Sequence, residues 1–268
     1  MTITSSPRVR QPASSDAGLP RLPDHAVRAE SVSKRFGEGS SSVLALDGVS
    51  LDVRRGEFVC VVGASGCGKS TLLSLIAGLD EPTSGELEVG GRTALMFQDS
   101  ALLPWRTAAA NVELPLKLRG VGKAKRAERA LELLDLVRLG EFAAKRPHEL
   151  SGGMRQRVAL ARALAQDADV LLMDEPFGAL DAITRDILHD ELERVVADKA
   201  LTVVFVTHNV REAARLGDRI LLLSSRPGTV VAEFPVDVPR PRRIEAPDVA
   251  AIAAEVTVQL RGEVRRHG

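Results

Sequence analysis

The stretch from Phe58 to Thr71, FVCVVGASGCGKST, constrains the fold of this 268-residue chain more than any other segment. It opens with a short apolar run, Phe58 to Val62, whose valines favour a strand buried on both faces. The next eight residues, Gly63 to Ser70, match the pattern G-x-x-x-x-G-K-[ST] at every fixed position. Apolar residues then recur at helical spacing as far as Leu79. A strand, a glycine loop and a helix in this order predict an α/β fold with a phosphate-binding loop.

The residue types of this loop explain what it can bind. Glycines allow successive backbone N–H groups to converge on an anion at the start of a helix. Lys69 adds a mobile positive charge for the β- and γ-phosphates, and the Ser70 hydroxyl is a candidate Mg²⁺ ligand. A glycine-rich turn with a surface lysine is the structural alternative, which the flanking strand and helix disfavour. We therefore expect a nucleoside triphosphate to contact Gly63, Ala64, Ser65, Gly66, Cys67, Gly68, Lys69, Ser70 and Thr71.

The composition is that of an ordinary globular protein, with 44% hydrophobic and 27% charged residues. Lys plus Arg and Asp plus Glu number 36 each, and this zero net charge argues against a dedicated nucleic-acid binder. No apolar run approaches the about 18 residues of a membrane span, and the N-terminus lacks the apolar segment of a secretory signal. We expect a reducing cytoplasm, in which Cys60 is a strand residue and Cys67 a loop thiol sensitive to oxidation.

Local composition divides the chain into three parts. Residues 1–26 are rich in Ser, Pro, Arg and Ala without periodicity, which predicts a disordered tail. Strand and helix patterns fill residues 27–235, which we interpret as one α/β domain with an antiparallel β subdomain. Within it, residues from about 99 to 165 lack strand signals and predict an inserted helical subdomain. Residues 236–268 predict an extended linker and a short amphipathic helix, which we expect to pack on the domain rather than bind a membrane.

Polar residues follow two further apolar strands. The run from Val170 ends in Asp174 and Glu175. Asp174 is placed to hold Mg²⁺ and Glu175 to polarise an attacking water. Acidic turn residues after a strand are common in isolation, but a phosphate-binding loop upstream favours the functional interpretation. The strand from Leu201 to Val206 leads to His208; a lone histidine is usually structural, yet strand ends are where doubly wound sheets bind ligands.

Three further signals are weaker, and two of them leave alternatives open. Gln98 follows a short strand and is either a surface residue or a ligand for Mg²⁺ or water. Phe36 either stacks on a nucleobase or belongs to the core. Ser151 is a good helix N-cap, but the next two residues, Gly152 and Gly153, are poor helix formers. This combination predicts a second helix N-terminus that receives an anion.

Taken in order, these motifs resemble those of the nucleotide-binding subunits of ATP-binding cassette (ABC) transporters over about residues 27–235. The matching segments are the phosphate loop Gly63–Thr71, the Q-loop residue Gln98, the signature LSGGMRQR at Leu150–Arg157, the strand Val170–Glu175, the D-loop Ala179–Asp181 and the switch residue His208. The resemblance implies an α/β P-loop fold in which a mixed, largely parallel sheet carries an antiparallel β subdomain and an inserted helical subdomain.

The resemblance also implies a mechanism that uses ATP and Mg²⁺. Two copies of the chain would pack head to tail, and the signature of one copy would cover the nucleotide held by the other. Glu175 would be the general base, with His208 and Gln98 completing the catalytic group, and Asp181 would couple the two sites. The implied nucleotide contacts outside the phosphate loop are Phe36, Ser151, Gly152, Gly153, Gln156 and Asp181, and the implied Mg²⁺ ligands are Ser70, Gln98 and Asp174.

The family resemblance further implies partners and a place in the cell. The helical subdomain and Gln98 would form a groove for an integral membrane permease at the cytoplasmic face of the plasma membrane, with a solute-binding protein as an indirect partner. The segment Phe97–Trp105 and the tail at Ser225–Gly228 and Pro239–Arg242 resemble bacterial importers of nitrate, taurine and aliphatic sulfonates. Packing of Trp105 within the subdomain is an alternative explanation for that residue.

A soluble ABC ATPase that acts on DNA or ribosomes is the competing function. Such proteins usually carry two cassettes or a long coiled-coil arm, whereas this chain has one cassette, no heptad repeat and zero net charge. A P-loop kinase is a third class, but it would not need the LSGGM segment or the histidine. The sequence therefore favours an ATPase that drives import.

Overall fold

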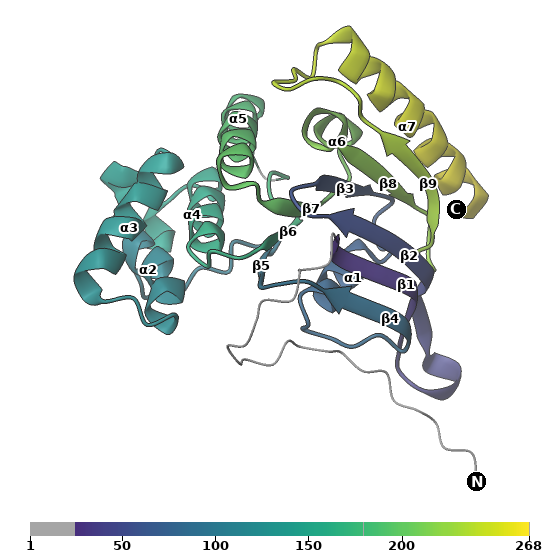
Figure 1. Ribbon diagram of the computed structural model, residues 1–268, viewed down its shortest axis with the longest axis horizontal. Helices are drawn as coiled ribbons and strands as arrows, with labels where there is room; N and C mark the ends of the chain where they lie inside the picture. The colour runs from purple at the N-terminus through teal and green to yellow at the C-terminus, as the bar shows by residue number, and fades with distance from the viewer. Residues whose placement is uncertain (1–24, 179, 268) are drawn as a thin grey trace, which may run out of the picture.

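The computed structural model describes residues 25–178 and 180–267 (Figure 1). The tail predicted for residues 1–26 thus lies almost entirely outside the described residues, and the first strand begins at His25. The strands are β1 (His25–Phe36), β2 (Val43–Arg54), β3 (Phe58–Val62), β4 (Ser84–Val89), β5 (Thr93–Met96), β6 (Val170–Asp174), β7 (Thr202–Thr207), β8 (Arg219–Leu223) and β9 (Val230–Pro235). The helices are α1 (Lys69–Ile76), α2 (Ala108–Leu118), α3 (Lys123–Leu136), α4 (Gly152–Leu164), α5 (Ala182–Lys199), α6 (Val210–Leu216) and α7 (Pro247–His267).

Two sheets form the framework. A six-stranded sheet has the order β5-β6-β7-β3-β8-β9, and its strands run parallel except for β9. A three-stranded antiparallel sheet has the order β2-β1-β4, which confirms the predicted antiparallel β subdomain and adds β4 to it. The strand β3 lies inside the larger sheet between β7 and β8, so the loop that follows it emerges at the middle of the sheet edge.

The larger sheet is buried on both faces, because its strands are almost continuously apolar. In β3, Phe58, Cys60 and Val62 face one hydrophobic cluster, and Val59 and Val61 face the other. Helix α1 lies in the second cluster, between the two sheets. The first cluster is closed by residues of α2 to α7, including the buried stripe of α4 and α5. The central strand is therefore fixed from both sides.

Helices α2, α3 and α4 form the predicted helical subdomain, which extends to one side of the sheets in Figure 1. Buried polar groups hold the chain that leads into it. Asn111 is fully buried, and its side-chain oxygen accepts from the Leu103 N–H at 2.8 Å. Arg162 of α4 donates to the carbonyls of Ser100 and Ala101 at 2.8 and 2.7 Å. The segment after β5 is thus attached to the helices rather than to the sheet.

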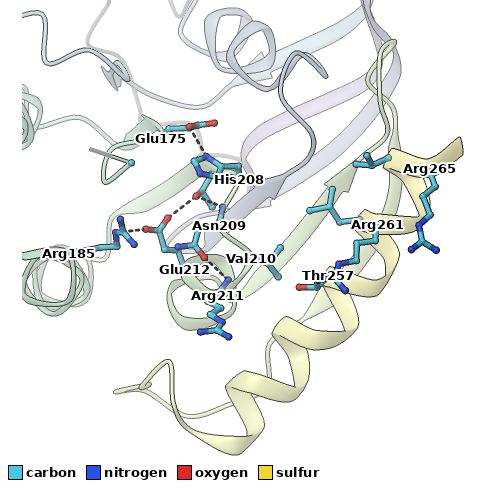
Figure 2. A pocket seen from close by; sticks show the side chains of 14 residues that line it. Glu175, Arg185, His208, Asn209, Val210, Arg211, Glu212, Thr257, Arg261 and Arg265 are labelled. Atoms are coloured by element: carbon cyan, nitrogen blue, oxygen red, sulfur yellow. Dashed lines mark hydrogen bonds and ion pairs between the residues drawn. The ribbon is translucent and has the colours of Figure 1, made fainter. Parts of the chain in front are cut away.

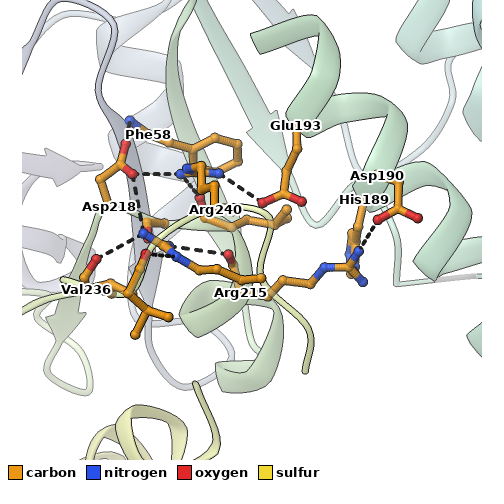
Figure 3. Close-up of polar contacts among 12 residues, drawn as sticks. Phe58, His189, Asp190, Glu193, Arg215, Asp218, Val236 and Arg240 are labelled. Carbon is orange, nitrogen blue, oxygen red and sulfur yellow. Dashed lines mark hydrogen bonds and ion pairs between the residues drawn. The ribbon is translucent and has the colours of Figure 1, made fainter. Parts of the chain in front are cut away.

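The C-terminal part is more firmly attached than the sequence indicates. Helix α7 has 21 residues and is therefore longer than the short helix that the sequence predicts. Val249, Ala253 and Val256 of α7 are buried against the domain. In the preceding linker, Arg240 donates to Asp218 at 2.7 Å and lies over the ring of Phe58 (Figure 3). Over residues 25–178 and 180–267, no helix has the length and apolar character needed to cross a membrane.

The packing of α7 makes a testable prediction. Val256 is fully buried and Val258, on the same helix, is exposed. We expect Val256→Ala to lower the free energy of unfolding by about 2 kcal/mol, because it removes buried methyl groups and leaves a cavity. The control Val258→Ala should change it by less than about 0.5 kcal/mol. Urea unfolding followed by circular dichroism measures both, and equal stabilities would mean that α7 does not belong to the folded core.

Candidate nucleotide-binding and catalytic site

The carboxyl ends of three neighbouring parallel strands meet at one edge of the larger sheet. Val62 at the end of β3 pairs with Thr207 of β7, and Asp174 at the end of β6 pairs with Val206. Segments that are far apart in the sequence therefore lie side by side at this edge, where open α/β sheets bind ligands. A cleft of about 550 Å³ opens there, lined by Phe36, Val43, Ala45, Ser65, Gly66, Gly68, Lys69, Ser70, Thr71, Gln98, Glu175, His208 and Arg226.

The phosphate loop wraps around the Lys69 side chain. The ammonium group is buried and donates to the carbonyls of Gly63 and Ala64, at 2.9 Å each. Helix α1 begins at Lys69, so its first N–H groups lack intrahelical acceptors and belong to the edge that lines the cleft. Free N–H groups, the helix dipole and a lysine together make an anion site suited to phosphate.

Gly68 is required by the shape of the loop. Its φ of +102° lies in the left-handed region, which strains a residue that carries a side chain. A Cβ atom there would lie 2.7 Å from Leu46 Cδ2 and 2.8 Å from the Ala45 carbonyl oxygen. Because Ala45 and Leu46 belong to β2, the close approach also joins the antiparallel sheet to the loop. Only glycine fits both demands.

Cys67 differs from expectation. The sequence predicts a loop thiol sensitive to oxidation, but its side chain is only 1% exposed. Burial raises the pKa of this thiol above its usual value, and the nearby charge of Lys69 only partly opposes the shift. Reactivity depends on an accessible thiolate, which these surroundings disfavour. The prediction of an oxidation-sensitive Cys67 is therefore wrong, and the residue is part of the packing beneath the loop.

Asp174 ends β6 beside the loop and supplies a carboxylate. Burial raises its pKa above the usual value; a hydrogen bond from the Ser70 hydroxyl lowers it, the Glu175 charge raises it, and the Lys69 charge lowers it. Ser70 and Asp174 thus offer neighbouring oxygen atoms, and Gln98 lines the same cleft. Mg²⁺ is usually held by one or two carboxylates together with substrate phosphates. The oxygen atoms of Ser70, Asp174 and Gln98 are therefore suitable ligands for Mg²⁺.

Glu175 and His208 form a pair across the mouth of the cleft. The Glu175 Oε2 atom lies 2.9 Å from His208 Nδ1, joined by a hydrogen bond (Figure 2). Glu175 has a φ of +45°, an uncommon conformation for a residue with a side chain, and its N–H donates to the Val206 carbonyl at 2.9 Å. Such strained positions concentrate at functional sites. Glu175 directly follows β6, so the chain takes this left-handed conformation at the point where the strand ends.

The two residues for which the sequence left alternatives open both line the cleft. Phe36 is 43% exposed at its rim, so the structure contradicts the core alternative. Its ring also lies 5.0 Å from the Lys34 ammonium. Gln98 is exposed and has its side chain at the cleft, two residues after the end of β5. The structure brings these residues together with the phosphate loop, Glu175 and His208.

The signature residues lie elsewhere. Ser151 caps α4, accepting from the Met154 N–H at 3.2 Å, and it is exposed together with Gly152. None of the described residues 151–153 lines the chain's own cleft. Gly153 approaches the D-loop closely, because a Cβ atom there would lie 3.0 Å from Leu180 Cδ2.

Two other predicted nucleotide contacts are engaged within the chain. Gln156 is buried, and its side-chain amide donates to the Gln98 carbonyl at 2.6 Å. In this arrangement it supports the backbone of the Q-loop residue and does not reach the surface. Asp181 caps α5 and accepts from the Thr184 N–H at 3.0 Å, while Ala179 of the predicted D-loop lies outside the described residues.

Arg226 is a site residue that the sequence did not single out. It lines the cleft, and its Nε donates to the Gly66 carbonyl at 3.2 Å. Arg226 follows β8, which is a neighbour of β3 in the sheet, so the pairing of strands brings it to the phosphate loop. Its segment, Ser225–Gly228, resembles the importers, but nothing in that segment marks Arg226 as a residue of the site, because one arginine in a turn is a common surface feature.

The geometry at Gly68 predicts a selective loss of nucleotide affinity. We expect Gly68→Ala to weaken ATP binding at least about tenfold, which corresponds to about 1.4 kcal/mol, because the added methyl must displace the loop from β2. Gly78→Ala is the matched control. Gly78 also has a positive φ, of +68°, but a Cβ atom added there would have no neighbouring atom within 4 Å. Titration with a fluorescent ATP analogue measures both variants; equal affinity would contradict this account of the loop.

Comparison with known proteins agrees with the geometry. The family model described as "ABC transporter" matches residues 46–178. A taurine import ATP-binding protein, TauB of Rhizobium johnstonii, is 48% identical over 84% of this chain and 88% of its own length. An aliphatic sulfonates import ATP-binding protein, SsuB 1 of Agrobacterium fabrum, is 44% identical over 97% of this chain and 96% of its own.

A solved structure is similar over the same region. A dimeric ATP-binding cassette in a post-hydrolysis state, bound to ADP and Pi, superposes with a TM-score of 0.73 at 36% identity, covering 80% of this chain and all of the other. The predicted fold class and family resemblance are thereby confirmed. The chain belongs to the ABC transporter family, as an ATP-binding subunit of its importers.

Proposed function

We propose that the chain hydrolyses ATP in the cleft at the ends of β3, β6 and β7 and thereby drives import of a small solute through a membrane permease. The observation that carries the proposal is the convergence of the phosphate loop, Asp174 and the Glu175–His208 pair at one sheet edge. A nucleoside triphosphate held by the loop would present its γ-phosphate to these groups. Positioned charges of this kind account for most of phosphoryl-transfer catalysis.

The polar residues of the phosphate loop and of the neighbouring strand ends, together with Phe36, have distinct roles in this proposal. Lys69 and the loop N–H groups hold the β- and γ-phosphates, and Phe36 stacks on the adenine. Ser70, Gln98 and Asp174 would hold Mg²⁺, which supplies positive charge to the phosphate oxygens. Glu175 orients the attacking water and accepts its proton. His208, hydrogen-bonded to Glu175, would contact the γ-phosphate from the end of β7.

A second copy of the chain completes the site. Ser151 and Gly152 are exposed at the N-terminus of α4 and outside the chain's own cleft, so they suit an anion held by another subunit. The dimeric state of the similar cassette supports this arrangement. Asp181 and the neighbouring Leu180 would lie where the two copies meet and would couple their sites.

The helical subdomain is the proposed docking region for the permease. Trp105 and Leu118 are exposed apolar residues of this subdomain. The bonds from Gln156 to Gln98 and from Arg162 to Ser100 connect α4 to the segment that enters the cleft. Closure at the nucleotide would thus reach the subdomain and the permease, with the chain bound peripherally at the cytoplasmic face of the plasma membrane.

The transported solute is proposed from resemblance. The segment Phe97–Trp105 is similar to that of importers of nitrate, taurine and aliphatic sulfonates. The relatives named for import of taurine and aliphatic sulfonates support the same group of small solutes. We propose a member of this group as the solute, selected by the permease and by a solute-binding protein that acts on this chain only indirectly.

The decisive test of transport is recovery of partners from native membranes. The tagged full-length chain is purified in detergent, and bound proteins are identified by mass spectrometry. We expect a protein with several transmembrane helices at equal stoichiometry, whose solute-binding partner is then screened against taurine, sulfonates and nitrate. Recovery with ribosomes or DNA and without a membrane protein would favour the soluble mechanical ATPase instead.

The proposed dimer makes a separate prediction. In Glu175→Gln, ATP should bind but turnover should nearly cease, so that a dimer accumulates in size-exclusion chromatography. Adding Ser151→Arg should abolish that dimer and leave ATP binding by each monomer intact, because the bulky cation occupies the surface that meets the partner's nucleotide.

The matched control for the dimer experiment is Thr107→Arg. Thr107 caps α2 in the same subdomain through a similar bond, from the Ala110 N–H at 3.1 Å, so its loss has a comparable effect on a helix end. The control should keep the ATP-dependent dimer. Weak ATP binding by the Ser151→Arg monomer would contradict the assignment of Ser151 to the partner's site.

A further inference from the structure

A buried carboxylate lies beneath the loop that carries His208. Glu212 of α6 is 4% exposed, and its Oε2 accepts a hydrogen bond from the Thr207 hydroxyl at 2.7 Å. Its Oε1 lies 3.3 Å from Arg185 Nε (Figure 2) and 3.7 Å from His189 Nε2. The carboxylate therefore accepts a hydrogen bond from β7 and faces two basic side chains of α5.

This environment keeps Glu212 ionised. Burial by itself would raise the pKa of the carboxyl group, but contacts with His189 and Thr207 and the charge of Arg185 outweigh burial and lower the pKa below its usual value. A buried charge is tolerated only where its partners are well placed, and removing one partner is costly. The positions of these partners are thus tightly specified by Glu212.

One of these partners directly precedes His208. The Thr207 hydroxyl donates to Glu212 and also accepts from the Asn209 N–H at 3.0 Å, so it fixes the backbone on both sides of His208. The imidazole itself is 63% exposed, and little packing holds it. Its 2.9 Å hydrogen bond to Glu175 therefore depends on where the loop is held.

The other main partner reaches the segment that follows Glu175. Arg185 donates from Nη2 to the Leu180 carbonyl at 2.8 Å, while its Nε faces Glu212. Leu180 is the residue that packs against the signature residue Gly153. The ion pair of Arg185 with Glu212 thus connects the segment after Glu175 to the loop that carries His208.

We propose that Glu212 is a positioning residue for ATP hydrolysis, which through Thr207 holds His208 at hydrogen-bond distance from Glu175 and through Arg185 ties this pair to the D-loop. The inference rests on the proposed roles of Glu175 and His208. Glu212 contacts neither nucleotide nor water in this account. Its effect is on catalytic geometry, where a displacement of about 1 Å can reduce a rate about a hundredfold.

Steady-state ATP hydrolysis by the full-length chain tests the proposal. Thr207→Val keeps the shape of the side chain and removes the hydroxyl, and we expect it to lower kcat about tenfold with KM for ATP within about twofold. Thr207→Ser retains the hydroxyl and should keep most of the activity. Glu212→Gln should also lower kcat, because a neutral amide holds Arg185 less firmly.

The two losses should not add. If Glu212 acts through Thr207, the double variant Thr207→Val with Glu212→Gln should have a kcat close to that of whichever single variant has the lower kcat. Multiplication of the two losses would overturn the proposed connection. Because Glu212→Gln is nearly isosteric, it provides a folded variant if Thr207→Val fails to fold.

Thr202→Val is the matched control. Thr202 is buried at the other end of β7, and its hydroxyl accepts from the Gly56 N–H at 3.0 Å. The control should lose a similar amount of thermal stability and keep the wild-type kcat. If Thr207→Val and Thr202→Val lower kcat equally, the role of Thr207 is only structural and the proposal fails.

His208→Ala separates this inference from the function on which it rests. If His208→Ala keeps the wild-type kcat, the proposed catalytic role of His208 is wrong. If His208→Ala loses activity while Thr207→Val and Glu212→Gln keep the wild-type kcat, only the positioning role of Glu212 is wrong. Loss of kcat in all three, with rescue by Thr207→Ser, supports both.

Discussion

The parallel pairing of β6, β7 and β3 is the constraint on which the rest of the structure depends. Backbone hydrogen bonds set Asp174 opposite Val206 and Val62 opposite Thr207, so the loops after these strands leave the sheet at one edge. Apolar side chains on both faces fix the register, since a slip by one residue would exchange the two faces of each strand. The apolar residues of the strands therefore position the site, although the side chains that would carry out the chemistry lie at the ends of the strands and on the segments that follow them.

Charged groups inside the protein lie close to this edge. Lys69 is held by loop carbonyls, and Glu212 by Thr207 and Arg185. Arg215 of α6 is also buried, and it binds the exposed side chains of Asp186 and Asp190 of α5 at 3.0 and 2.5 Å; Figure 3 shows the bond to Asp190. Buried ion pairs add little net stability, because desolvation offsets their attraction. The contacts of Glu212 with Arg185 and of Arg215 with Asp186 and Asp190 are better explained by the geometry they impose on α5 and α6.

Much of the fold and part of the site could be predicted from sequence, for a shared reason. The phosphate loop, the N-cap Ser151 and the apolar strands depend on residues adjacent in the chain, and the structure contains them close to their predicted bounds. Phe36 was ambiguous because a single aromatic residue suits a core or a ligand, and only its place at the cleft decides between these. The roles of these residues in nucleotide chemistry stay predictions.

The sequence by itself determined the local devices: a strand that ends in a glycine loop, a lysine at a helix start, and carboxylates and a histidine after buried strands. The tertiary structure alone decided where the side chains of loop and polar residues lie. Cys67 is buried, Gln156 binds the backbone of a residue 58 positions away, and Arg226 reaches the loop from β8. The physical reason is separation along the chain. Local backbone preferences act over a few residues, whereas burial and long-range hydrogen bonds exist only after the sheets and helices have packed.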